Sequence, residues 1–219
     1  MATRAPGRSG VEKPGDEERR RALAESALRT LGELGYARTS LREVADHSGE
    51  GEGAVHYYFA DKLDLVVYSI RYYKATCVRR YDDVVASART AEGLREAFAA
   101  KLAETIVEEA PMHRLWYDLR SQAMFEDGLR EAVLAIDGTL EEMVWRVVSR
   151  YAELAGGRPV VPWPAAYALF DGLFQRALLG HLCGDAGALD RLRAGVDPVF
   201  AMIVPAGARQ RGEVSAGSR

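Results

Sequence analysis

The segment from residue 39 to residue 65 constrains the fold more than any other part of the chain, because it has the pattern of two short helices joined by a tight turn. Thr39 or Ser40 can cap a first helix, and Gly49 suits its end. A second short helix is predicted over residues 52 to 58. Both can close against an apolar stripe in the preceding segment, which consists of Ala24, Ala27, Leu28, Leu31 and Leu34. This pattern indicates a helix-turn-helix, for which DNA is the first partner to consider.

The same segment resembles the amino-terminal part of the TetR family of bacterial one-component regulators. The residues that match the family pattern in order and spacing are Gly35, Tyr36, Thr39, Val44, Ala45, Gly49, Gly53, Val55, Tyr57, Tyr58, Phe59 and Lys62. Residues 114–119 and 171–178 look like the regulatory half of that family. The resemblance implies an all-α fold, with an amino-terminal three-helix head and a carboxy-terminal helical domain for ligand sensing and dimerisation.

The length of the chain fits this division. Its 219 residues suffice for one small and one medium-sized domain. We expect a disordered arm over residues 1–16 and a DNA-binding domain over residues 17–62. A regulatory and dimerisation domain is expected over residues 63–205, followed by a disordered tail over residues 206–219.

The composition indicates a cytoplasmic protein without a membrane partner. Apolar residues make up 48% of the chain and charged residues 28%, and no run of about twenty uncharged apolar residues appears. The first residues carry positive charge with no apolar stretch after it, unlike a secretory signal. Cys77 and Cys183 lack the spacing of metal ligands, and we expect both to be buried small apolar side chains in a reduced protein.

Apolar spacing predicts only helices after the head. A single long helix is expected from residue 63 to about residue 88. Another follows the cap residue Thr90 and is interrupted at Pro111. The best-defined helix spans residues 129–154 and ends at a Gly-Gly pair. Two further helices complete the chain.

These last two helices carry a broad apolar face. Its residues are Ala166, Leu169, Phe170, Leu173, Phe174, Ala177, Leu178, His181, Leu182, Leu189, Leu192, Val196, Val199, Phe200 and Ile203. By the resemblance, the two helices form a homodimer interface with their copies, where Gly172 and Gly180 allow close approach. The alternative is that they complete the core of the monomer.

The resemblance also assigns DNA contacts. It implies that Thr39, Tyr57 and Lys62 contact phosphates, and that the residues facing bases are Arg42, Gly53, Ala54 and His56. Ser40 and Glu52 complete the predicted DNA-binding set. Arg42 is suited to guanine, although it can equally be a solvated helix residue. Of Tyr57 and Tyr58, we expect one ring to pack in the core.

The charge of this segment is unusual for a DNA-binding surface. Residues 36–62 hold three basic and five acidic side chains. Glu50, Gly51 and Glu52 stand where the family typically has Val-Ser-Lys. Two carboxylates suit a helix start but repel phosphates. Either Glu52 accepts a hydrogen bond from cytosine N4, or the head binds DNA poorly. Further basic residues can supply phosphate contacts or lie on a solvated surface: Arg4, Arg8, Lys13, Arg19, Arg20 and Arg21.

The regulatory half of the family generally binds a small effector. Aromatic, polarisable and cationic residues are the predicted ligand-binding set: Tyr72, Trp116, Tyr117, Arg120, Met124, Trp145, Phe170 and Phe174. Residues of these types at helical spacing also form protein cores. Arg120 lies on an otherwise apolar segment and needs a partner, either a carboxylate such as Asp118 or Glu141 or an acidic ligand.

No motif of an enzyme is present in the sequence. It has no Gly-rich phosphate loop, no Gly-x-Ser-x-Gly elbow, and only scattered histidines, so we expect no catalytic residue, metal site or cofactor. The predicted function is a TetR-like repressor that a small-molecule effector releases from a near-palindromic operator. Repressor rather than activator follows the family's habit. The alternative is a dimeric ligand- or protein-binding module whose acidic recognition helix binds DNA weakly or not at all.

Overall fold

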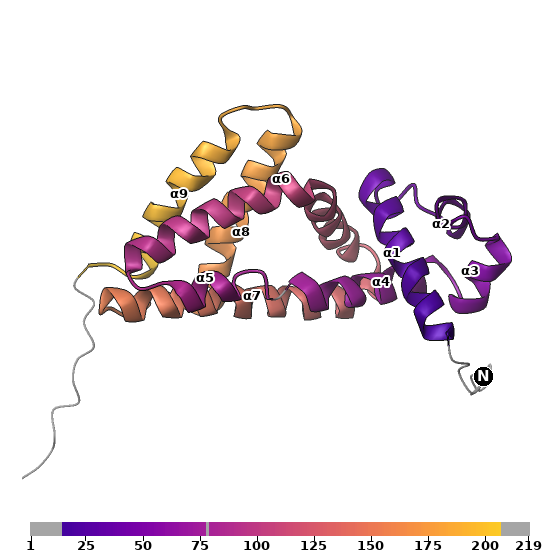
Figure 1. The fold of residues 1–219 in the computed structure, drawn as a ribbon, viewed down its shortest axis with the longest axis horizontal. Helices are drawn as coiled ribbons and strands as arrows, with labels where there is room; N and C mark the ends of the chain where they lie inside the picture. The colour runs from indigo at the N-terminus through magenta and orange to yellow at the C-terminus, as the bar shows by residue number, and fades with distance from the viewer. Residues whose placement is uncertain (1–14, 78, 207–219) are drawn as a thin grey trace, which may run out of the picture. The chain divides into compact units, whose positions relative to one another are not determined.

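The computed structural model describes residues 15–77 and 79–206. For residues 74–77 it describes the backbone alone. These residues form nine α-helices and no strand (Figure 1), which confirms the all-α prediction. Contacts divide the chain into two compact units, residues 1–72 and residues 73–219. We call them the head and the regulatory unit. The predicted limits of the arm and tail fall mostly outside the described residues, except that Asp16 is already helical.

The head contains α1 (Asp16–Leu34), α2 (Leu41–Ser48), α3 (Glu52–Tyr58) and the first part of α4 (Lys62–Cys77). The three short helices share one small core, as predicted. Its buried residues are Leu23, Ala27, Leu41, Val44, Ala45, Val55, Phe59 and Leu65.

Local hydrogen bonds fix the two helices of the turn. Ser40, rather than Thr39, caps α2, since its hydroxyl accepts a hydrogen bond from the Glu43 amide at 3.3 Å. Thr39 is buried, and its hydroxyl donates to the Gly35 carbonyl at 2.9 Å. Gly49 ends α2 at a φ of 72°, which glycine adopts without strain. The predicted bounds of α3 are confirmed.

The regulatory unit contains the end of α4 and five further helices. These are α5 (Asp82–Ser87), α6 (Ala91–Ala123), α7 (Asp127–Ala155), α8 (Trp163–Leu182) and α9 (Ala188–Ile203).

The prediction of one helix from residue 63 to residue 88 is wrong, because α4 ends at Cys77 and α5 begins at Asp82. The turn that precedes α5 buries Tyr81, whose ring packs on Phe98 with centroids 5.1 Å apart. The apolar spacing continues through the break because Tyr81 and the apolar residues of α5 contact the core that contains Phe98.

Pro111 bends α6 without ending it. Glu109 has φ of −129° and ψ of 27°, outside the helical region, and the helix resumes and continues to Ala123. Proline lacks an amide hydrogen and clashes with the preceding turn, which accounts for the kink. The predicted interruption is therefore a bend within a single long helix.

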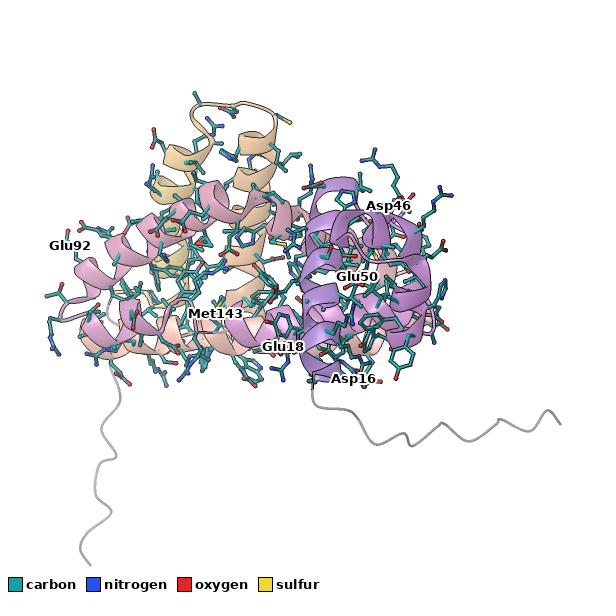
Figure 2. The ribbon with its side chains drawn as sticks, turned by 45° about the vertical axis from the view of Figure 1, so that its right-hand side comes forward. Asp16, Glu18, Asp46, Glu50, Glu92 and Met143 are labelled. Carbon is teal, nitrogen blue, oxygen red and sulfur yellow. The ribbon has the colours of Figure 1, made fainter. Side chains whose placement is uncertain are left out.

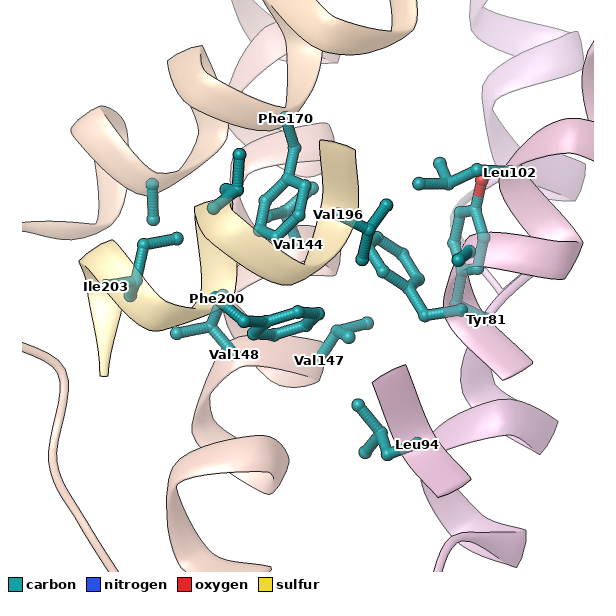
Figure 3. Close-up of a cluster of buried hydrophobic side chains, with 14 of the residues drawn as sticks. Tyr81, Leu94, Leu102, Val144, Val147, Val148, Phe170, Val196, Phe200 and Ile203 are labelled. Carbon is teal, nitrogen blue, oxygen red and sulfur yellow. The ribbon is translucent and has the colours of Figure 1, made fainter. Parts of the chain in front are cut away.

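One large core joins the helices of the regulatory unit, and Figure 3 shows part of it. Phe98 (α6), Phe170 (α8) and Phe200 (α9) meet edge to face, with centroids 5.1 to 6.0 Å apart. Most apolar residues predicted on α8 and α9 are buried in this core, including Phe170, Leu178 and Val196. The monomer core therefore takes up much of the predicted face.

Cys183, which follows α8, is exposed, so the prediction that it is buried is wrong. It lies beyond the last turn of a helix whose inner face is already filled by Ala177 and Leu178. The side chain of Cys77 lies outside the described part of the chain.

Candidate functional site

The second helix of the turn, α3, presents most of its side chains to solvent. Val55 is its fully buried residue and anchors it to the head core. Glu52, Gly53 and His56 are exposed, and Tyr57 retains 72% of its accessible surface. A Cβ at Gly53 would meet nothing within 4 Å, so the glycine leaves the surface open. This is the face that a recognition helix turns toward base edges.

The two adjacent tyrosines have different surroundings. The Tyr58 hydroxyl donates to Asp16 at 3.2 Å, and its half-buried ring lies 4.9 Å from that of Tyr57, edge to face. Tyr58 is therefore the ring that packs against the head, and Tyr57 is the one available to a partner.

The two carboxylates before and within α3 are not equivalent. Both oxygens of Glu50, which is labelled in Figure 2, lie 3.2 Å from Nη2 of Arg19 on α1. Glu52 lies on the exposed face, and its Oε1 is 3.8 Å from Nε2 of His56 one turn later. One carboxylate is thus neutralised within the head, and the other remains on the recognition face.

Each member of the arginine run on α1 has a partner inside the head. Arg19 pairs with Glu50, and Arg21 pairs with Glu17 at 3.2 Å. The Arg20 guanidinium lies 4.3 Å from the ring centroid of Tyr68, a cation–π contact. The side chains of Arg19 and Arg21 stay exposed in these pairs, whereas Arg20 packs on Tyr68. Arg4, Arg8 and Lys13 lie outside the described residues.

Two of the three predicted phosphate contacts, Lys62 and Thr39, also have internal partners. Lys62 donates to the carbonyl of Tyr36 and lies 4.0 Å from the centroid of its ring. Thr39 is buried, as described above. Arg42, by contrast, is exposed and forms no hydrogen bond or ion pair with the described residues. Its guanidinium is free to meet a partner.

A cavity of about 630 Å³ lies in the regulatory unit between α6, α7 and α8. Its lining combines charged, hydroxyl and apolar side chains. These are Tyr117, Arg120, Ser121, Ala123, Met124, Arg130, Val133, Leu134, Asp137, Asp171 and Gln175. The volume is that of a small-molecule site.

Arg120 ties the three helices together at this cavity. Its Nη1 donates to Asp171 Oδ2 at 2.7 Å, and its Nε lies 3.6 Å from Asp137 Oδ2. The Tyr117 hydroxyl donates to Asp171 at 2.9 Å, and the Tyr167 hydroxyl donates to Asp137 at 2.8 Å. Arg120 thus has internal carboxylate partners, as one sequence alternative required, but they are neither Asp118 nor Glu141.

Burial and the nearby carboxylates keep the two tyrosines neutral and Arg120 charged. Burial raises the pKa of Tyr117 far above its usual value, and Asp171 raises it further. Burial raises the pKa of Tyr167 in the same way. For Arg120, burial alone would lower the pKa, but the hydrogen bond with Asp171 raises it above its usual value. Both tyrosines remain neutral donors and Arg120 remains a cation.

The cavity collects three of the eight predicted ligand-binding residues: Tyr117, Arg120 and Met124. Trp116 lies beside it, since its ring centroid is 6.0 Å from the Arg120 guanidinium carbon. Phe170 is 3% exposed in the main core, and Trp145 packs against the same core.

The remaining two predicted ligand-binding residues do not line the cavity. The Tyr72 hydroxyl donates to Glu25 at 2.8 Å within the head. The Phe174 ring lies 4.8 Å from that of His113 and does not line the cavity.

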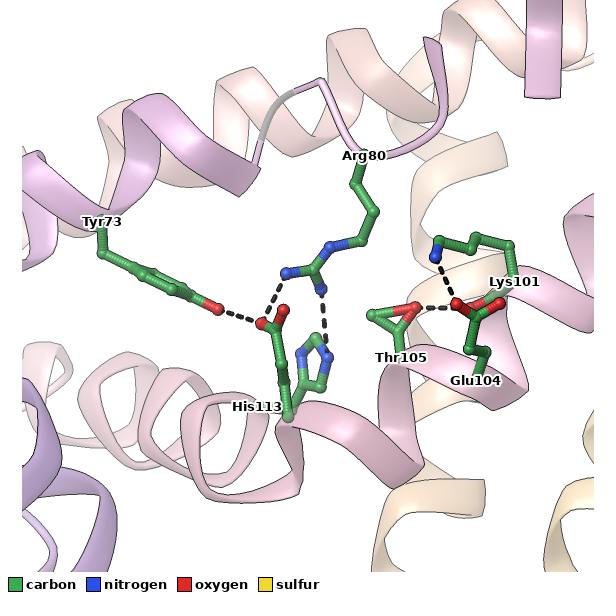
Figure 4. A network of polar contacts seen from close by, with 7 residues as sticks. Tyr73, Arg80, Lys101, Glu104, Thr105 and His113 are labelled. Atoms are coloured by element: carbon green, nitrogen blue, oxygen red, sulfur yellow. Dashed lines mark hydrogen bonds and ion pairs between the residues drawn. The ribbon is translucent and has the colours of Figure 1, made fainter. Parts of the chain in front are cut away.

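A second polar cluster lies at the bend of α6 (Figure 4). Tyr73 and Arg80 both donate to the carboxylate of Glu109, and the Arg80 guanidinium lies 3.3 Å from His113 Nε2. Burial, reinforced by Arg80, lowers the pKa of His113 to about 4, so the ring is neutral near pH 7. Burial alone would raise the pKa of Glu109, but its hydrogen bonds with Tyr73 and Arg80 lower it.

The predicted site residues included none of the carboxylates of these two clusters, which are Asp137, Asp171 and Glu109. Asp137 lies one turn after buried Val133 on α7, and Asp171 lies one turn after buried Tyr167 on α8. A charged residue on an otherwise apolar helix face is the signal that selected Arg120. The same test applied to carboxylates would have found Asp137 and Asp171.

An exposed short helix held on a three-helix core, in a chain with a separate helical unit, defines a helix-turn-helix protein with a regulatory domain. The family model for bacterial regulatory proteins of the tetR family matches residues 23–68. The HTH-type transcriptional regulator BetI of Burkholderia mallei (strain NCTC 10229) is 30% identical over 191 residues, which cover 84% of this chain and 95% of that protein. The chain belongs to the TetR family and is a DNA-binding transcriptional regulator.

Solved structures agree on the fold. A transcriptional regulator from Saccharomonospora viridis in complex with choline aligns with a TM-score of 0.68 at 16% identity, over 86% of this chain and 98% of that one. FadR from Bacillus subtilis in complex with stearoyl-CoA aligns with a TM-score of 0.66 at 13% identity, over 83% and 98%.

Two negative findings apply to the described residues. None of their helices combines the length and apolar character that a bilayer span requires. They also hold no group of three or more His, Cys, Asp or Glu side chains suited to a metal ion.

Proposed function

We propose that this chain is a homodimeric repressor that leaves its operator when a small molecule binds the cavity between α6, α7 and α8. The cavity is the observation that carries the proposal, because a ligand there contacts three helices that a single ion-pair network holds together. The complexes of similar folds with choline and stearoyl-CoA support a small-molecule effector. These two ligands carry opposite charge, so the fold alone does not select the charge of the effector.

The proposed operator contacts are those of the exposed face of α3 and the start of α2. Ser40, Arg42, Glu52, His56 and Tyr57 are accessible for direct contact. Gly53 leaves the surface of α3 open to bases, and half-buried Ala54 follows it. Thr39 and Lys62 hold the head in shape through their bonds to Gly35 and Tyr36, and a phosphate contact by either would be additional.

The proposed dimer forms through α8 and α9. A stripe of small and apolar residues remains exposed on them after the monomer core is complete: Ala168, Leu169, Gly172, Leu179, Ala194, Pro198, Ala201 and Met202. A Cβ at Gly172 would meet nothing within 4 Å, which leaves room for a second copy. Gly180 has another role, since a Cβ there would lie 2.9 Å from that of Ala188 within the same chain. A two-fold dimer places one head on each half of a near-palindromic operator.

Binding of the purified full chain to its own upstream region tests this function. Fluorescence anisotropy at about 50 and about 200 mM salt should give sequence-selective binding that weakens as salt rises. Sedimentation should give a dimer. If the chain is dimeric and binds no upstream fragment better than unrelated DNA, the alternative of a binding module with an inactive head replaces the repressor.

A further inference from the structure

The charges around the cavity do not balance. Asp137 and Asp171 both face it, and Arg120 is the cation that pairs with both. The two carboxylate side chains are 22% and 16% exposed, so solvent only partly screens them. One guanidinium therefore serves two half-buried carboxylates, which leaves one negative charge in excess.

The second lining cation does not offset this excess. Arg130 pairs with Asp127 three residues earlier, and its guanidinium donates to the carbonyls of Ala123 and Met124 at 3.0 and 3.3 Å. These bonds secure the turn from α6 to α7. The charge of Arg130 is matched by Asp127, and its hydrogen atoms are directed to backbone oxygens.

The hydrogen bonds of the lining also favour a ligand that donates hydrogen bonds. The hydroxyls of Tyr117 and Tyr167 and the guanidinium of Arg120 already donate to the two carboxylates. Each carboxylate still has acceptor capacity, since its two oxygens offer about four lone-pair sites. A ligand that enters meets spare acceptors and negative charge at Asp137 and Asp171, while the strongest donors are occupied.

Another part of the cavity lining is apolar. Met124 and Leu134 line it with 69% and 68% of their surfaces exposed, and Val133 and Ala123 lie beside them. Covering such side chains contributes about 25 cal/mol per Å² of apolar surface. A ligand with an apolar body and one positively charged group would match both the carboxylates and the apolar residues of the lining.

We propose that the cavity binds a small organic cation, whose ammonium or guanidinium group lies at Asp137 and Asp171 and whose apolar body covers Met124, Val133 and Leu134. The proposal rests on the proposed function in taking this cavity as the effector site. A cation there competes with Arg120 for the carboxylates and so acts on the ion pairs that join α6 to α7 and α8. This is a route by which binding can change the packing of the three helices.

Calorimetric titration of the full chain with three probes of similar shape tests the charge preference. The probes are benzylammonium, phenylacetate and benzyl alcohol. We expect the cation to bind at least about tenfold more tightly than the other two. Asp171→Asn and Asp137→Asn should each weaken its binding about tenfold, whereas Asp190→Asn, on the exposed surface of α9, should leave it unchanged. Thermal unfolding of each variant checks that it is folded.

Preference for phenylacetate, or equal binding of all three probes, would overturn the proposal. Cation binding that survives both aspartate substitutions would overturn the assigned position. The outcome for the proposed function is separate. If benzylammonium binds through Asp171 but the chain recognises no operator, the repressor fails and the cation site stands. If the chain binds its operator and an anion releases it, the repressor stands and the cation site fails.

Discussion

The head and the regulatory unit use charged side chains in different ways. In the head, Arg19, Arg20, Arg21 and Lys62 all have partners within the unit, and the recognition helix carries no lysine or arginine. In the regulatory unit, charges gather around a cavity, where one arginine serves two carboxylates. The head thus pairs these four cations internally, and the regulatory unit keeps an excess negative charge at its cavity.

This difference shows how an acidic chain can belong to a family of DNA-binding proteins. A small set of exposed groups on the head must supply selectivity, since the phosphate attraction of a basic surface is weak here.

The core residues should give the largest effects, one in each unit. Phe200→Ala and Phe59→Ala each remove a fully buried ring, and we expect each to cost about 3–5 kcal/mol of unfolding free energy in its own unit. Chemical denaturation followed by circular dichroism measures this cost. Phe125→Ala, whose ring is 84% exposed, is the control and should cost less than about 0.5 kcal/mol. Equal costs for the three variants would refute the assigned cores.

Arg120→Met should be the most damaging charge substitution. It leaves Asp137 and Asp171 half-buried without their cation, which should cost about 3 kcal/mol. Arg193→Met removes an exposed pair with Asp190 and should cost less than about 1 kcal/mol. Denaturation of the two variants side by side provides the measurement. If Arg120→Met were as stable as the parent, the network would not hold the three helices.

Acid should weaken the regulatory unit through His113. The fold holds this ring neutral with a pKa of about 4, whereas an unfolded histidine takes up a proton below about pH 6.5. The unfolded chain therefore binds more protons between these values, so the stability contribution is complete above pH 6.5 and falls as the pH drops toward 4. The loss approaches about 3 kcal/mol. Unfolding titrations of the parent and His113→Gln should differ in slope over this range, and parallel curves would rule out the assignment.

Arg42 and Tyr57 should affect DNA binding in different ways. Arg42→Gln should relax one operator position by about 1–3 kcal/mol, because the exposed guanidinium is free to meet a base. Tyr57→Phe should weaken binding uniformly across operator sequences, because a phosphate contact carries no base information. Anisotropy with operators substituted at single positions separates the two patterns. Uniform weakening by both variants would remove Arg42 from base recognition.

The ion pair between Arg19 and Glu50 should give the smallest effect. Because Arg19 already neutralises Glu50, Glu50→Gln alone should improve operator affinity by less than about 0.5 kcal/mol. In an Arg19→Gln background the freed carboxylate should repel DNA, so the same substitution should help more. A double-mutant cycle on operator affinity measures the difference. An equal gain in both backgrounds would mean that Glu50 repels DNA despite its partner.

Sequence reasoning predicted the helices well wherever apolar spacing and a stop signal coincided. Gly49 and the bounds of α3 follow from local chemistry, and so does the bend at Pro111. The break between α4 and α5 could not be predicted in this way, because Tyr81 preserves the helical spacing while turning into the core. The residue pattern records burial, and here α4 and α5 bury their apolar residues in the cores of different units.

The candidate sites were less predictable, because they depend on pairs of residues far apart in sequence. Arg120 stood out as a lone charge, but its partners Asp137 and Asp171 come from two other helices. Similarly, Glu50 and Glu52 looked alike until α1 placed Arg19 beside one of them. Helix packing decided which charges are paired, and the linear pattern does not contain that information.

The role of Glu52 is the most direct test of how this head recognises DNA. Operator affinity of the parent and Glu52→Gln should be measured on a panel in which each operator base pair is changed in turn. The account predicts that the substitution relaxes discrimination at one C·G pair by about 1–3 kcal/mol and leaves the other positions unchanged. A uniform gain in affinity across the whole panel would contradict it, since Glu52 would then only repel the phosphates.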